Sequence, residues 1–222
     1  MAKSVELLIY DFDGVIADSE VSATIALQRV LAEHGCSMEL DGVMQHFMGK
    51  REQDVIAAMR HLTGSPEPDL SREFREATLN ALANLSEVPG ARATIEAFPC
   101  LARCIASSSS RKRLDFCLDR LGMWGLFDEN VFSAEQVACG KPSPDIFLFA
   151  AQAMGFAPAQ ALVIEDSVGG VTAARAAGMR AFGITAASHI QPETAERLFA
   201  AGAEAVFSSH PQLCNAILQL VG

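Results

Sequence analysis

Acidic side chains directly follow the first apolar segment of the chain. Leu7–Tyr10 is followed by Asp11, Phe12, Asp13 and Gly14. Two carboxylates two positions apart repel each other unless a cation or a proton offsets their charge. Asp and Gly are also common in turns, so this segment alone leaves open both a turn and a catalytic pair. At the carboxyl edge of a parallel sheet, such a pair could supply a nucleophile and an acid/base.

Three later segments also carry polar side chains that could do chemistry, two of them directly after an apolar run as at Asp11. A second apolar segment ends at Ser107, where a hydroxyl and free backbone N–H groups suit a phosphate oxygen, although the serines there could also cap the following helix. Lys141 lies in a loop that prolines restrict, as an electrostatic clamp requires, whereas most loop lysines are solvated. The apolar segment Leu162–Ile164 runs into Glu165 and Asp166, which could also be a turn.

Taken together, these groups predict a site for a hard cation. Several carboxylates in one crevice would repel one another and would also repel an anionic substrate. Mg²⁺ resolves both problems, because it prefers oxygen ligands and usually binds a few carboxylates while keeping several waters. Phosphoryl transfer uses this chemistry, since it requires that charge be neutralised and that the attacking oxygen be aligned.

The elements that must position these residues follow from the apolar pattern. Six short segments are compatible with β-strands: Val5–Tyr10, Cys104–Ala106, Val131–Phe132, Leu162–Ile164, Ala181–Ile184 and Ala205–Phe207. Helical patterns lie between most of them, including Arg111–Leu121, Gly169–Ala177 and Ser143–Met154, the last with Ser143 as N-cap. This alternation predicts an α/β fold built from βαβ units, with a mainly parallel sheet.

One stretch interrupts the alternation. From Ser19 to about Leu85 there are helical patterns and no convincing strand. The predicted helices are Ser19–His34, Arg51–Leu62 and Ser71–Leu85, with a loop at Thr63–Asp69. We therefore expect an all-helical domain, residues 17–86, inserted into a core formed by residues 1–16 and 87–222.

Composition restricts the possible function classes. The chain has 222 residues, a net charge of −10, 50% hydrophobic residues and six cysteines. This is ordinary globular usage, and an acidic chain is a poor binder of duplex DNA or anionic membranes. No apolar run approaches the ~20 residues of a membrane span, and the N-terminus is unlike a signal peptide. We expect a cytoplasmic monomer or weak homo-oligomer whose cysteines are buried free thiols.

The ordered set Asp11-x-Asp13, Ser107, Lys141 and Glu165-Asp166 resembles the haloacid dehalogenase superfamily. Within it, the segments Asp13–Glu20 and Gly140–Asp145 are similar to the sugar-phosphate phosphatase and β-phosphoglucomutase-like branch. The resemblance covers nearly the whole chain. It implies a Rossmann-like core, and a helical cap inserted after the first strand that selects the substrate.

The resemblance also implies roles for individual residues. Asp11 would be the nucleophile that forms an aspartyl-phosphate, and Asp13 the acid/base. Ser107 and the backbone N–H of Ser108 would hold phosphate oxygens, and Lys141 would pair with Asp11 and the phosphoryl group. The metal ligands of Mg²⁺ would be the Asp11 carboxylate, the Asp13 carbonyl, Asp166 and, through a water, Glu165.

Departures from the family patterns favour one reaction. Dehalogenases lack the second acid, which is present here as Asp13. Phosphonatases use a cap lysine, and Lys50 is the only lysine in the proposed cap, so that chemistry is discounted. β-Phosphoglucomutases usually carry a His ten residues after the second Asp, where this chain has Ala23. We expect a phosphatase acting on a small phosphorylated sugar or sugar acid, with a phosphomutase as the alternative and a non-catalytic phosphometabolite-binding protein as a further, weaker one.

Some basic residues and one histidine are harder to interpret. In the proposed cap, Gly49 permits a bend, and Lys50 and Arg51 could contact the substrate, or they could form a solvated face with Glu52 as partner. His189 follows the fifth predicted strand, and we expect it on the surface, outside the catalytic set. We expect the triplet Arg111–Arg113 to be a solvated first helical turn, a position that the helix dipole disfavours for cations.

Overall fold

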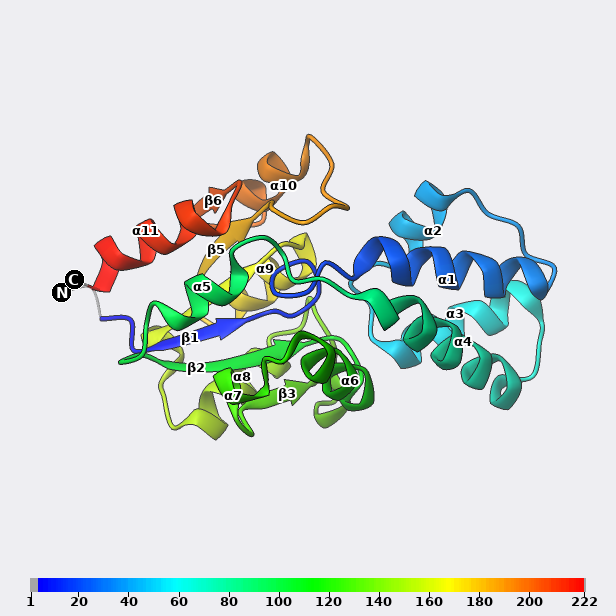
Figure 1. Cartoon of the computed structure of the whole chain (residues 1–222), viewed down its shortest axis with the longest axis horizontal. Helices are drawn as coiled ribbons and strands as arrows, with labels where there is room; N and C mark the ends of the chain where they lie inside the picture. The colour runs from blue at the N-terminus through cyan, green and yellow to red at the C-terminus, as the bar shows by residue number, and fades with distance from the viewer. Residues whose placement is uncertain (1–3, 222) are drawn as a thin grey trace.

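The computed structural model describes residues 4–221, so residues 1–3 and 222 of the predicted core lie outside the described part. Six parallel strands form one sheet in the order β3-β2-β1-β4-β5-β6 (Figure 1). The strands are β1 (Leu7–Tyr10), β2 (Ala102–Ser107), β3 (Val131–Ser133), β4 (Ala161–Glu165), β5 (Arg180–Ile184) and β6 (Ala205–Phe207). All six predicted segments form strands, which confirms the α/β Rossmann-like fold.

Helices cover both faces of the sheet, which explains why the central strands are continuous apolar runs. Along β1, Leu8 and Tyr10 pack on one face, and Leu7 and Ile9 on the other. The first face is covered by α5 (Ala91–Glu96), α6 (Arg111–Leu121), α7 (Trp124–Phe127) and α11 (His210–Val221). The second is covered by α8 (Asp145–Met154), α9 (Val168–Ala176) and α10 (Thr194–Ala200).

The segment between β1 and α5 is helical and lies beyond one end of the sheet (Figure 1). It contains α1 (Glu20–Glu33), α2 (Leu40–Phe47), α3 (Glu52–Thr63), α4 (Glu67–Ala81) and the short 3₁₀ helix η1 (Leu82–Asn84). These helices enclose an apolar cluster of their own: Leu27, Val30, Leu31, Val43, Phe47, Val55, Ile56, Met59, Leu70 and Phe74. We call this segment the helical insert.

The helical insert differs from the predicted elements in two places. The short helix α2 was not predicted as a separate element. Helix α4 begins at Glu67 rather than at Ser71, so the predicted loop Thr63–Asp69 is too long. Pro66 and Pro68 do not prevent this earlier start. A proline fits the first turn of a helix, because the backbone N–H groups there have no partner within the helix.

Two backbone hydrogen bonds join the connections that enter and leave the insert. Asp18 N donates to Ser86 O at 3.0 Å, and Val88 N donates to Ile16 O at 2.8 Å. The two connections therefore run side by side at the predicted joints. A division into a core and a cap that acts as a separate domain, with boundaries at residues 17 and 86, stays a prediction.

Within residues 4–221, no helix is both long enough and apolar enough to cross a membrane. All six cysteines are free thiols, as expected. Cys104 and Cys117 are buried, but Cys100 and Cys139 are exposed because they lie in surface turns. The expectation that all six are buried is therefore wrong.

Candidate active site

Three carboxylates meet at the carboxyl edge of the sheet. Asp11 follows β1, Glu165 ends β4, and Asp166 comes next. Strands β1 and β4 are neighbours at the point where the strand order reverses, which is where open α/β sheets form a crevice for ligands. One oxygen atom from each of the three buried carboxylates lies within 4.8 Å of the others, so the structure brings together the acids predicted to bind a metal.

Gly14 allows one of these carboxylates to approach the exit of β1. Its φ of +77° belongs to the left-handed region that favours glycine. A Cβ atom at this position would lie 1.8 Å from Asp166 Oδ2. The Asp11–Gly14 turn and Asp166 can therefore pack this closely only because residue 14 has no side chain.

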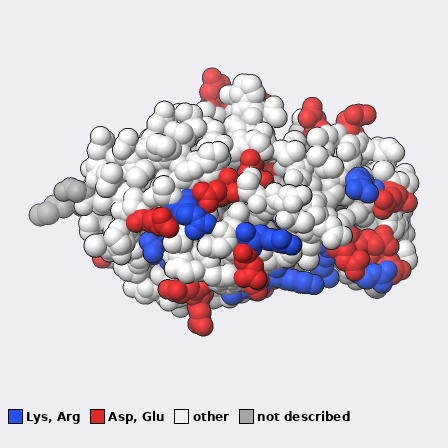
Figure 2. Space-filling model, viewed as in Figure 1, with Lys and Arg blue, Asp and Glu red and all other residues white. Residues whose placement is uncertain are grey.

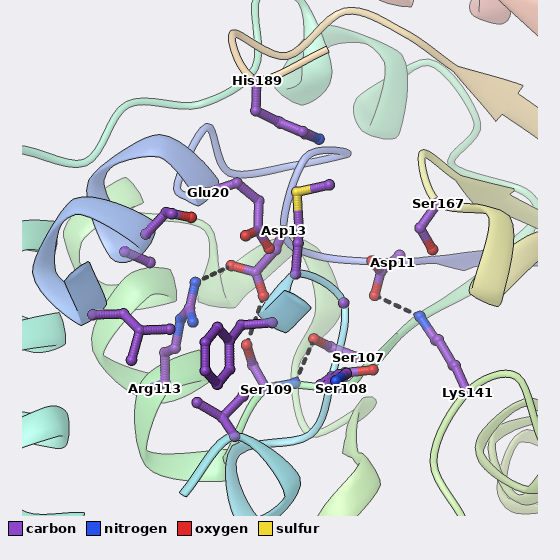
Figure 3. A pocket seen from close by; sticks show the side chains of 18 of the residues that line it. Asp11, Asp13, Glu20, Ser107, Ser108, Ser109, Arg113, Lys141, Ser167 and His189 are labelled. Carbon is purple, nitrogen blue, oxygen red and sulfur yellow. Dashed lines mark hydrogen bonds and ion pairs between the residues drawn. The ribbon is translucent and has the colours of Figure 1, made fainter. Parts of the chain in front are cut away.

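Lys141 bridges two of the carboxylates. Its Nζ donates to Asp11 Oδ1 at 2.8 Å, to Glu165 Oε1 at 2.6 Å and to Ala106 O at 3.2 Å. The side chain is 4% exposed, so it is a desolvated cation and not a solvated loop lysine. The predicted clamp residue and the predicted nucleophile are in direct contact (Figure 3).

The three carboxylates carry more negative charge than Lys141 offsets. Burial raises the pKa of Asp11 well above its ordinary value; Lys141 opposes this rise, and the neighbouring Glu165 and Asp166 add to it. Both oxygens of Glu165 are already engaged, since Oε1 accepts from Lys141 and Oε2 accepts from the backbone N–H groups of Asp166 and Ser167. A hard divalent cation fits this all-oxygen donor set and its excess negative charge, with Asp11 and Asp166 as the more available carboxylates.

Residues 107–110, four consecutive serines at the end of β2 that we call the serine loop, supply hydroxyl groups to the same crevice. Ser107 is buried, and its Oγ accepts from the backbone N–H of Ser109 at 3.0 Å. The Ser108 hydroxyl is buried and has no hydrogen-bond partner within residues 4–221, although Ser108 lines the cavity above Asp11. Ser110 is the N-cap residue of α6 without a side-chain capping bond, and Ser109 Oγ donates to Asp13. Ser110 therefore occupies the predicted N-cap position, but neither its side chain nor that of Ser109 makes the expected capping hydrogen bond.

Asp13 is held by three side chains from two parts of the chain. Its Oδ1 accepts from Ser19 Oγ and, at 2.6 Å, from Arg113 Nη2, and its Oδ2 accepts from Ser109 Oγ at 2.6 Å. Figure 3 shows the contacts with Arg113 and Ser109. Burial acts to raise the pKa of Asp13, but Arg113 and the two hydroxyl groups outweigh it and hold this pKa below its ordinary value. Asp11 and Asp13 therefore have opposite pKa shifts, although they are only two residues apart.

The expectation that Arg113 is solvated is wrong. Arg111 and Lys112 are exposed, but the Arg113 side chain is only 17% exposed and pairs with Asp13. Position 113 lies one turn before Cys117, on the helix face that packs against the sheet. All three cations are unfavourably placed near the start of α6, and the four-residue spacing to Cys117 is the sequence signal that separates Arg113 from Arg111 and Lys112.

His189 is also buried, contrary to the expectation of a surface position. Its Nε2 lies 3.1 Å from Asp166 Oδ2. This contact forms because the loop after β5, which carries His189 (Figure 3), folds back over the sheet edge. Burial acts to lower the pKa of His189, and the contact with Asp166 outweighs it, so the pKa is raised.

Glu20, at the start of α1, lines the same cavity. Burial and the nearby Asp13 raise the pKa of Glu20 to about 7.

The two cations proposed in the cap have different positions. Gly49 and Lys50 line the cavity above Asp11, which has a volume of about 90 Å³. Arg51 turns away from it, donating to Asp54 Oδ2 at 2.8 Å and to Ala138 O at 2.9 Å. The predicted alternative partner Glu52 instead pairs with Arg75. Only Lys50 of this pair is brought to the site.

Comparisons with known proteins agree with this geometry. The sequence pattern of the haloacid dehalogenase-like hydrolases matches residues 8–184. A fructose-1-phosphate phosphatase of Escherichia coli is 32% identical over 177 residues, covering 78% of this chain and 93% of that protein. A 6-phosphogluconate phosphatase from the same organism is 25% identical over 191 residues, covering 85% and 86%.

Solved structures of similar fold point to the same family. A haloacid dehalogenase-like protein of Agrobacterium tumefaciens is 33% identical, with a TM-score of 0.80 over 99% of this chain and 100% of that one. The parallel sheet, the carboxylates at its edge and the sequence match therefore lead to one conclusion: the chain belongs to the haloacid dehalogenase-like hydrolase family and is a hydrolase of the phosphatase class.

Proposed function

We propose that the protein is a Mg²⁺-dependent phosphatase that hydrolyses a small phosphorylated sugar or sugar acid through an aspartyl-phosphate. The observation that carries this proposal is the contact of Lys141 with Asp11, beside Asp166 and Glu165 and opposite the separately held Asp13. Asp11 is paired with a buried cation at the base of the cavity, and Asp13, which other side chains hold, would transfer the proton.

In the first step, an Asp11 oxygen attacks the phosphorus of the ester, and the bond from phosphorus to the alcohol oxygen breaks. Asp13 gives its proton to the departing alcohol oxygen. The arriving phosphate dianion favours this protonated form, because negative charge beside Asp13 raises its pKa. In the second step, Asp13 takes a proton from water, the water oxygen attacks the aspartyl-phosphate, and inorganic phosphate leaves with Asp11 restored.

The other residues hold the phosphoryl group. Lys141 Nζ and the hydroxyl of Ser107 face its oxygens, and the unpartnered Ser108 hydroxyl and backbone N–H provide further donors. The ion would be held by the Asp11 carboxylate, the Asp13 carbonyl and Asp166, with Glu165 acting through a water. When bound, Mg²⁺ neutralises charge on the phosphoryl oxygens.

Hydrolysis is favoured over mutase chemistry by Ala23. This residue lines the cavity at the position where the mutase pattern has a His. A methyl group forms no hydrogen bond, so nothing at this position restrains an attacking water. A non-catalytic binding protein is disfavoured because Asp11, Asp13 and Lys141 are all present and in contact with polar partners.

The leaving group has space beside the reaction site. A second cavity, of about 290 Å³, adjoins the first and shares Lys50, Val55, Phe74 and Arg113 with it. Its lining combines apolar, hydroxyl, cationic and acidic side chains from the helical insert, the serine loop, α6 and the segment after β3, with Glu52 and Glu135 as the acids, and this mixed polar lining suits a small polyol or sugar acid. We propose on this basis that the insert acts as the cap that selects the substrate.

Release of inorganic phosphate from a panel of sugar and sugar-acid phosphates, with Mg²⁺ present, tests this function. The panel includes β-glucose 1-phosphate with a trace of the bisphosphate, so that mutase turnover is detected as well. Asp11→Asn should lower every turnover number by about 10³-fold or more. Phosphate release that survives this change in a folded variant would refute the nucleophile assignment.

A further inference from the structure

Three hydrogen-bond donors leave the Asp13 carboxylate one free acceptor position. A carboxylate has about four lone-pair sites, two on each oxygen. Ser19 Oγ and Arg113 Nη2 both donate to Oδ1, and Ser109 Oγ donates to Oδ2. The remaining site is on Oδ2, so a transferable proton on Asp13 belongs on that oxygen.

The position of Arg113 is energetically unfavourable for a cation, apart from its contact with Asp13. Its side chain is largely removed from water, and its Nε has no hydrogen-bond partner within residues 4–221. It also stands in the first turn of α6, where the helix dipole disfavours a cation. Helix stability therefore does not explain an arginine here, whereas Asp13, with Glu20 close by, does.

We propose that Arg113 is a positioning residue that acts through Asp13. By occupying Oδ1 together with Ser19, it fixes the plane of the carboxylate and restricts proton exchange to Oδ2. The proton then passes between Oδ2 and the leaving-group oxygen in the first step, and between the attacking water and Oδ2 in the second. This inference rests on the proposed phosphatase function.

The leaving group provides the test. An alkyl phosphate needs a proton on its departing oxygen, whereas p-nitrophenyl phosphate departs as a stable phenolate and needs none. The value of kcat/KM reports the steps up to alcohol release, so it isolates the acid role of Asp13. For Arg113→Met we expect kcat/KM to fall about 10- to 100-fold for the alkyl ester and less than about 3-fold for the aryl ester.

Arg111→Met is the matched control, because it removes an exposed arginine from the same helical turn. We expect the ratio of alkyl to aryl kcat/KM to stay at the wild-type value in this variant. Equal losses on the two esters for Arg113→Met would show a general structural role and overturn the proposal. An increase in alkyl activity would overturn it as well, because Arg113 would then be holding Asp13 out of position.

A double-mutant cycle tests the pathway of the effect. If Arg113 acts through Asp13, adding Arg113→Met to Asp13→Asn should change alkyl kcat/KM by less than about 2-fold. A further loss as large as in the wild-type background would refute the inference. This double variant leaves no unpaired carboxylate at residue 13, so it also tests the idea if the single variant fails to fold.

Arg113→Lys provides a second test of the positioning role. It keeps the positive charge but presents a single point donor, so the alkyl-to-aryl ratio should lie between those of wild type and Arg113→Met. A ratio no better than that of Arg113→Met would refute a role for the cation. If wild type hydrolyses neither ester, the proposed function itself has failed; if it hydrolyses both, only the role of Arg113 is in question.

Discussion

At the scale of single residues, environment separates two aspartates of identical chemistry. Asp11 shares a buried corner with Glu165 and Asp166, so its carboxylate is short of positive charge. Asp13 is surrounded by an arginine and two hydroxyl groups, so its carboxylate is well compensated. The first environment calls for a further cation, whereas Arg113 already supplies one in the second.

Metal binding should therefore be visible as stability. After EDTA treatment, adding Mg²⁺ at ten times its dissociation constant should stabilise the wild type by about 1.4 kcal/mol, or about 3–6 °C in Tm. Asp166→Asn removes one carboxylate charge and should lose most of this shift. Calorimetry with and without Mg²⁺ measures the change in Tm of both proteins. Equal shifts in the two proteins would mean that the ion binds elsewhere, and no shift in wild type would remove the metal proposal.

At the scale of elements, the loop after β1 is secured by the last helix. His210, the first residue of α11, is fully buried, and its Nε2 lies 2.8 Å from Val15 O. A carbonyl oxygen only accepts, so Nε2 carries the hydrogen and the neutral ring has Nδ1 unprotonated. Nδ1 has no hydrogen-bond partner within residues 4–221. The turn that carries Asp13 and Gly14 thus depends on a neutral histidine from the far end of the chain.

The stability of the fold should reflect this histidine. Burial lowers the pKa of His210 below its ordinary 6.5, although the bond to Val15 O opposes the shift. Below pH 6.5 the unfolded chain binds the proton more readily, so this group's contribution to stability is complete above that pH. It is lost as the pH falls toward the folded-state pKa, by up to about 1.4 kcal/mol per pH unit.

His210→Gln keeps a donor for Val15 O and removes the titration. Between pH 7 and pH 5, the free energy of unfolding of wild type should fall relative to that of this variant. Urea unfolding at a series of pH values measures the difference. Parallel curves for the two proteins would contradict the predicted shift of His210.

At the scale of the whole molecule, the site lies where the helical insert meets the sheet edge. The chain carries a net charge of −10, and Asp and Glu form several groups on the face in Figure 2, with Lys and Arg between them. The cations that face the cavity without a role in holding Asp13 are few and local: Lys141 from the core and Lys50 from the insert. The long-range field repels anions, so under the proposed function binding of the phosphate ester would depend on Lys141, Lys50 and the proposed metal ion.

Lys50 and Arg51 form a matched pair for testing the insert. Lys50→Ala should lower kcat/KM for the preferred sugar phosphate about 10-fold or more, and that for a small aryl phosphate much less, because Lys50 faces the cavity. Arg51→Ala should affect the two substrates equally, since Arg51 links Asp54 to Ala138 O outside that cavity. Steady-state kinetics on both esters decide this. Equal losses on both esters for Lys50→Ala would exclude Lys50 as a specificity residue.

The sequence by itself determined the fold class and the principal acids. Apolar runs between helices that end at glycines identify all six strands, and chain connectivity places Asp11, Ser107 and Glu165 at their carboxyl ends. These are local properties, because a strand end and the residue after it are adjacent in the chain. For the same reason the sequence order already predicted Lys141 in a restricted loop beside them.

Only the tertiary structure decided which side chains surround Asp13 and Asp166. Arg113 lies 100 positions from Asp13, and His189 reaches Asp166 through a loop that folds back over the edge. Their types and their flanking residues predicted a solvated turn and a surface loop. Burial and pairing are properties of packed elements, and the charge balance that sets a pKa depends on neighbours in space, which the linear pattern does not contain.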